Sequence, residues 1–131
     1  MKINHIGIAV KKIEESIGIY TTLLGKGSVQ FEGVPGDSVR VAFVQIGGSR
    51  IELLEPISPA SPVHKFIERY GEGIHHIAIE VRDINKAIHT LKSRGVRMID
   101  DTPRKGAHDM LIAFVHPESA NGVLLELCQQ E

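Results

Sequence analysis

Four side chains with metal-binding chemistry occupy paired positions in this sequence. They are His5, Glu52, His76 and Glu126; the two histidines lie 71 residues apart and the two glutamates 74 residues apart. Imidazole nitrogens and carboxylate oxygens together suit a first-row divalent metal, and four protein ligands leave two octahedral positions open for a substrate. The quartet therefore predicts a metal site, with all four residues as ligands and no separate cofactor-binding site.

The histidines belong to two copies of one strand pattern. Residues 4–10 align with residues 75–81, and both copies continue through two polar residues into a helical pattern. Side chains alternate between the faces of a strand, so each histidine shares its face with a very small residue, Gly7 in the first copy and Ala78 in the second. We expect this arrangement to leave room for a ligand on that face.

The same order of elements follows in both halves of the chain. Helical periodicity extends over residues 13–20 and 84–91, and each helix is expected to stop near a glycine, Gly25 or Gly95. Strand-like runs then follow at 28–31, 39–46 and 51–55 in the first half and at 96–99, 111–115 and 123–127 in the second. This order is βαβββ, twice.

The repeat predicts an α+β fold in which two tandem βαβββ modules form a curved mixed sheet around the metal site. We expect a single domain, residues 1–131, with module one at 1–56, a linker at 57–73 and module two at 74–131. The linker contains prolines and a short helical stretch at 63–70.

Composition excludes several classes of function. Fifteen basic and sixteen acidic side chains give a formal net charge of −1, which provides no field for binding nucleic acid. No apolar run approaches the roughly 18 residues of a membrane span. The single cysteine, Cys128, allows no disulfide within the chain, and we expect a cytoplasmic protein.

The five remaining histidines carry weaker signals. His64, His75 and His89 are expected at the surface, because they lie in the linker, on the opposite strand face and on a helix. His108 and His116 flank a predicted strand, where contact with substrate and ordinary turn chemistry are both consistent with the sequence.

Several segments resemble a known family. The paired modules and the quartet resemble the vicinal oxygen chelate superfamily, which includes glyoxalase I and ring-cleaving dioxygenases. Residues 71–78 (GEGIHHIA), 95–97 (GVR), 114–117 (FVHP) and 122–127 (GVLLEL) look in particular like the methylmalonyl-CoA epimerases of that superfamily. The resemblance covers nearly the whole chain.

This resemblance implies a metal-assisted proton transfer that interconverts the two C2 epimers of methylmalonyl-CoA. Cobalt is the metal it implies first, with nickel, manganese or zinc as alternatives, and an acyl-CoA substrate and a homodimer are further implications. Glu126 and Glu52 would then supply acid–base groups on the two faces of the substrate. Arg104, Lys105 and Arg40 are candidate partners of the CoA phosphates, although isolated basic residues are equally typical of a solvated surface.

One departure from the resemblance concerns Glu52. Epimerases often place glutamine there and carry a second catalytic carboxylate elsewhere, but residues 39–44 (VRVAFV) offer no acid. The second base is therefore Glu52 itself or a residue that the sequence does not identify.

Three alternative functions follow from the same superfamily. Glyoxalase I, a lyase acting on the methylglyoxal–glutathione hemithioacetal, uses the same metal chemistry. A non-catalytic ligand-binding module commonly lacks the metal ligands, so the intact quartet disfavours it. A ring-cleaving dioxygenase prefers two histidines and one carboxylate on iron, and the second carboxylate disfavours that function.

Overall fold

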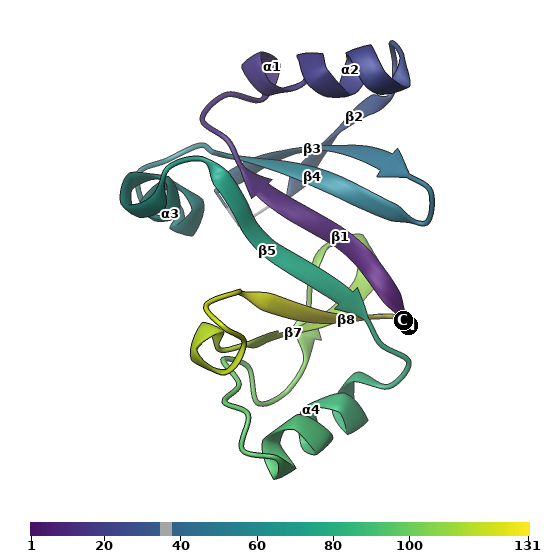
Figure 1. Ribbon diagram of the computed structural model, residues 1–131, viewed down its shortest axis with the longest axis vertical. Helices are drawn as coiled ribbons and strands as arrows, with labels where there is room; N and C mark the ends of the chain where they lie inside the picture. The colour runs from purple at the N-terminus through teal and green to yellow at the C-terminus, as the bar shows by residue number, and fades with distance from the viewer. Residues whose placement is uncertain (35–37) are drawn as a thin grey trace. The chain divides into compact units, whose positions relative to one another are not determined.

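The computed structural model describes residues 1–34 and 38–131. Within these ranges the chain forms eight strands and four α-helices (Figure 1). In chain order they are β1 (Lys2–Ala9), α1 (Ile13–Ser16), α2 (Gly18–Leu24), β2 (Val29–Val34), β3 (Val39–Ile46), β4 (Ser49–Pro56), α3 (Pro62–Tyr70), β5 (Gly73–Glu80), α4 (Ile84–Ser93), β6 (Arg104–Lys105), β7 (Met110–Val115) and β8 (Leu125–Gln130). None of the helices in the described part of the chain is long and apolar enough to cross a membrane.

The chain divides into two compact units. One unit comprises Met1–His5 and His76–Glu131, and the other comprises Ile6–His75. Both boundaries fall inside a strand, so β1 and β5 each contribute one part to each unit. The module boundaries expected from the sequence stay a prediction.

In the unit of residues 6–75, the strand order is β2-β3-β4-β1. A two-residue turn joins β3 to β4, and Gly47 at its tip has a φ of 57°, a conformation that glycine adopts without strain. Helices α1 and α2 lie along one face of these strands (Figure 1), where Ile13 packs against Val10 and Leu53. The opposite face carries Glu52.

In the other unit, the strand order is β5-β8-β7-β6. Strand β8 pairs parallel to β5 and antiparallel to β7, which makes the sheet mixed and confirms the predicted α+β class. Helix α4 packs through Ile84 and Ile88 against Val81 and Leu127, and the Asp83 side chain caps its first turn. The apolar strand face thus meets the helix.

Two predicted elements differ from the structure. Residues 96–99 do not form a strand; they make an isolated bridge between Met98 and Val115, because the amide of Arg97 instead donates to the Ser119 hydroxyl. The edge strand is β6, further along the chain. The helix predicted over residues 13–20 is two short helices that meet at Ile17, immediately before Gly18, whose flexibility favours a break there.

Candidate metal centre

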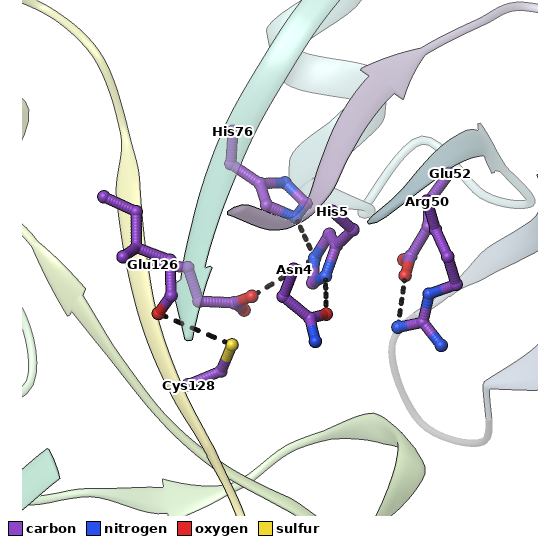
Figure 2. A network of polar contacts seen from close by, with 8 residues as sticks. Asn4, His5, Arg50, Glu52, His76, Glu126 and Cys128 are labelled. Carbon is purple, nitrogen blue, oxygen red and sulfur yellow. Dashed lines mark hydrogen bonds and ion pairs between the residues drawn. The ribbon is translucent and has the colours of Figure 1, made fainter. Parts of the chain in front are cut away.

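Three of the predicted metal ligands converge in the unit formed by residues 1–5 and 76–131. His5 Nε2 lies 3.0 Å from His76 Nε2 and 3.2 Å from Glu126 Oε2 (Figure 2). The ligand atoms of the three residues all lie within 4.8 Å of one another. All three side chains are buried, with 6–8% of each residue exposed.

The spacing of these atoms suits a divalent ion. Ligands bound at about 2.1 Å and at right angles to each other are separated by about 3 Å. The two short distances within the trio, 3.0 and 3.2 Å, match that separation. Two nitrogen ligands and one carboxylate oxygen are also the mixed donor set that first-row divalent metals prefer. The residues therefore fit the metal that the sequence predicts.

Asn4 fixes the orientation of the His5 ring. Its Oδ1 accepts a hydrogen bond of 2.8 Å from His5 Nδ1, which leaves Nε2 as the nitrogen that presents a lone pair to the site. A hydrogen bond to the non-ligating nitrogen is the usual way to hold a metal-binding histidine. Asn4 gave no signal in the sequence, since neighbouring strand residues point to opposite faces.

The strand register explains why His76 and Glu126 lie close together. His76 and Glu126 lie on adjacent parallel strands, with Ala78 paired to Glu126 and completely buried beside it. Phe114 of β7 stands opposite Glu126, and its ring makes an edge contact with the His76 ring at 6.2 Å. The small alanine and the aromatic ring frame the trio on one face of the sheet.

Glu52, the fourth predicted ligand, belongs to the unit of residues 6–75 and has a different environment. It is buried, and its Oε2 lies 3.1 Å from Nη2 of Arg50, two residues earlier on β4 (Figure 2). The Arg50 guanidinium also lies 5.5 Å from the centre of the Phe43 ring. Arg50 was not singled out in the sequence, although residues two positions apart on one strand share a face.

Four of the other histidines have contacts or exposure unrelated to the trio. His116 accepts a hydrogen bond from the amide of Glu118, so turn chemistry accounts for it. His89 is exposed and His64 pairs with Glu68, in line with the surface placement expected for both. His75, also expected at the surface, is half-buried and packs its ring against Phe66.

Comparison with known proteins identifies the family. The family model of the glyoxalase/bleomycin resistance protein/dioxygenase superfamily matches residues 4–114, and the chain belongs to this superfamily. The expected vicinal oxygen chelate family is thereby confirmed.

Within the superfamily, the chain is similar to epimerases. It is 40% identical over 127 residues to the mitochondrial methylmalonyl-CoA epimerase of Dictyostelium discoideum, with 96% of this chain and 76% of the relative covered. It is 38% identical over 130 residues to the ethylmalonyl-CoA/methylmalonyl-CoA epimerase of Cereibacter sphaeroides, covering 98% of this chain and 97% of the relative.

A solved structure agrees with these relatives. A variant of Streptomyces coelicolor methylmalonyl-CoA epimerase in complex with 2-nitronate-propionyl-CoA superimposes with a TM-score of 0.88 at 34% identity, covering 99% of this chain and 94% of that chain. The expected resemblance to methylmalonyl-CoA epimerases is confirmed.

Proposed function

We propose that this chain is a metal-dependent epimerase that interconverts the C2 epimers of methylmalonyl-CoA. The observation that carries the proposal is the buried trio of His5, His76 and Glu126 in a chain that aligns over almost its full length with epimerases. We propose an acyl-CoA substrate on similar grounds, because a related solved structure is a methylmalonyl-CoA epimerase in complex with methylmalonyl-CoA.

The proposed metal site comprises His5, His76 and Glu126, with Glu52 as the fourth ligand because it occupies the equivalent place in the repeat. A divalent ion at this site would supply Lewis-acid stabilisation of the negative charge that develops on the substrate oxygens when the C2 proton leaves. Cobalt is the metal we propose, and nickel, manganese and zinc share the same ligand preferences.

Glu126 and Glu52 are the proposed acid–base groups. One carboxylate takes the proton from C2, and the other, in its acid form, delivers a proton to the opposite face of the same carbon. The turnover leaves the first group protonated and the second ionised, and exchange with water restores both. Two carboxylates at equivalent positions of a duplicated unit supply the two groups that this reaction needs.

Glyoxalase I is not favoured as an alternative. It shares the metal chemistry, but the relatives and the solved structures described above are methylmalonyl-CoA epimerases. The proposal extends to a homodimer, the assembly that the family resemblance implies, and to a cytoplasmic location, for which the single cysteine, Cys128, is the support.

The test is solvent deuterium incorporation at C2 of methylmalonyl-CoA, followed by mass spectrometry with the protein as purified, after chelation and after cobalt is restored. We expect fast exchange that chelation abolishes and cobalt rescues. The absence of exchange with a fully metallated protein would exclude the epimerase activity, and the methylglyoxal–glutathione hemithioacetal would then be the substrate to assay.

A further inference from the structure

A half-buried cation lies beside one of the two proposed acid–base groups. The side chains of Arg50 and Glu52 are 16% and 11% exposed, and their charged ends lie 3.1 Å apart. Removing a guanidinium from water costs free energy unless a partner compensates for the lost hydration. In this pair each charge compensates the other, so the contact is more than an exposed surface ion pair, which contributes little.

The geometry also fixes the direction of the carboxylate. Arg50 and Glu52 point to the same face of β4 because they are two residues apart, and Phe43 lies opposite Glu52 in the register with β3. The guanidinium is 5.5 Å from the Phe43 ring centre and contacts Oε2 of Glu52. A planar cation held against an aromatic ring loses little freedom when it binds a carboxylate, so it orients that carboxylate well.

The second half of the chain has no cation at the equivalent sequence position. Position 124 is equivalent to position 50 at the 74-residue offset, and it is occupied by leucine. Glu126 instead lies 3.2 Å from a nitrogen of His5. The two carboxylates of the repeat therefore have different partners, an arginine for Glu52 and a histidine for Glu126.

We propose that Arg50 is a positioning residue that holds Glu52 in place as the acid–base group for one face of the substrate. This inference rests on the proposed epimerase function and deepens it, because it makes the two carboxylates unequal. Arg50 acts through Glu52 and does not itself transfer a proton. Loss of Arg50 should therefore impair the proton transfers of Glu52 and leave those of Glu126 intact.

In a reaction with two bases, a defect in one base has a specific effect on isotope exchange. The equilibrium constant requires any variant to slow epimerisation equally in both directions. Deuterium exchange into unreacted substrate is different, because it needs only the base on the face from which the proton leaves. A defect confined to Glu52 should therefore slow exchange for one epimer while the other still exchanges through Glu126.

The experiment compares the cobalt-loaded wild type with Arg50→Gln, Arg50→Lys and Glu52→Gln. Each epimer is incubated separately in D2O, and deuterium is measured early in both the unreacted substrate and the product. Arg69→Gln is the matched control, since Arg69 also lies against an aromatic ring, 5.3 Å from the centre of Tyr70, but on the exposed end of α3. Cobalt content and the unfolding temperature are measured for every variant.

We expect Arg50→Gln to lower epimerisation about 10–100-fold, the usual cost of removing a partner of a functional carboxylate. Exchange should fall by the same factor for one epimer and stay near the wild-type rate for the other. Glu52→Gln should give the same asymmetry with a larger loss, and Arg50→Lys a smaller loss, because it retains the charge but not the planar fork. Cobalt content and the control should stay at wild-type values.

Three outcomes would overturn the inference while epimerase activity stands: wild-type behaviour of Arg50→Gln, equal loss of exchange for both epimers, or loss of cobalt from the variant. If Arg50→Gln does not fold, Arg50→Lys alone decides between these outcomes. Absence of exchange in the metallated wild type is a separate result, and it would remove the proposed function together with the inference.

Discussion

Each half of the chain places one carboxylate at an equivalent position in its sheet, but the side chains around the two carboxylates differ. Glu52 on β4 pairs in register with Phe43 on β3, and Glu126 on β8 pairs with Phe114 on β7. Both glutamates are buried. The duplicated pattern thus specifies the strand, the face and the aromatic neighbour of each carboxylate.

An arginine lies against the phenylalanine in both halves, but it comes from a different strand. Arg50 comes from the same strand as Glu52 and reaches its carboxylate, whereas Arg104 comes from the edge strand β6 and contacts Asp100 at 3.3 Å. Glu126 instead has the His5 ring as its neighbour.

This difference shows that the repeat determines the position of each carboxylate, while the side chains around the carboxylate determine its chemical role. Glu126 shares its site with two imidazoles and is suited to bind a metal. Glu52 has an arginine as its neighbour, and this contact orients its carboxylate. Substitutions that make one half more like the other, or less like it, test this distinction.

The largest effect is expected for Glu126→Gln. A glutamine retains an oxygen that can bind a metal but cannot accept a proton, so turnover should fall at least about 100-fold while most of the metal remains. The assay is the epimerisation rate together with the cobalt content of the purified variant. Glu118→Gln is the control, because Glu118 is exposed and pairs with Arg97. Full activity of Glu126→Gln would remove this residue from the mechanism.

A smaller effect is expected when the second half is given the cation of the first. Leu124→Arg introduces a guanidinium two residues before Glu126, at the position equivalent to Arg50. The new charge should compete with the metal for the carboxylate and lower cobalt affinity about tenfold, the low end of the range for altered partners of a metal ligand. Isothermal titration with cobalt measures this change.

Leu124→Gln separates charge from shape in that experiment. It introduces a polar side chain without the charge, so its cobalt affinity should lie close to that of the wild type. An equal loss in both variants would mean that Leu124 supports the site by packing and that the charge is irrelevant.

The sequence predicted which strands carry the site residues better than it predicted the contacts of their side chains. The repeat predicted a shared site for His5, His76 and Glu126 because each lies on a strand with regular alternation, and the structure brings these three side chains together. Their role as metal ligands stays a prediction. Whether Glu52 joins them as a ligand stays a prediction.

Contacts between side chains were the part that the sequence could not supply. The bond from Asn4 to His5 joins adjacent residues that alternation assigns to opposite faces, and the link from Arg104 to Asp100 depends on a strand that no pattern indicated. Residues 96–99 were apolar enough to suggest a strand, but the amide of Arg97 donates to the Ser119 hydroxyl and only an isolated bridge between Met98 and Val115 forms. Such contacts depend on how the chain packs, which periodicity does not encode.

Arg104→Gln should have a moderate effect confined to the second half. Its guanidinium lies 5.6 Å from the Phe114 ring centre, and Asp100 also accepts a hydrogen bond from the Phe114 amide at 2.8 Å. Because the side chain is 56% exposed, the loss of this cation–π contact should cost only about 0.5–1 kcal/mol of stability. Thermal unfolding measures this cost, and a KM raised with kcat unchanged would place Arg104 among the groups that bind the substrate.

The two halves also begin their first helices in equivalent ways. The amide of Ile13 donates to Glu55 Oε1 at 2.8 Å, and the amide of Ile84 donates to Gln129 Oε1 at 2.7 Å. Both acceptors come from the last strand of their half, but only Glu55 carries a charge. The first half alone adds Arg40, which lies 3.8 Å from Glu55.

The smallest predicted effect tests this charged version of the helix start. Arg40 also binds Glu14 on α1 and, through that hydrogen bond, lowers the pKa of the Glu14 carboxyl. A pKa that is lower in the folded state stabilises the fold above the ordinary carboxyl pKa, and this stabilisation is lost as the pH falls through the lowered value. Arg40→Gln should return the Glu14 pKa toward its ordinary value, with only a slight loss of stability at neutral pH because Glu14 is exposed. An NMR titration of the Glu14 carboxyl, with Arg69→Gln as control, measures the shift, and an unchanged pKa in Arg40→Gln would show that the guanidinium is not its cause.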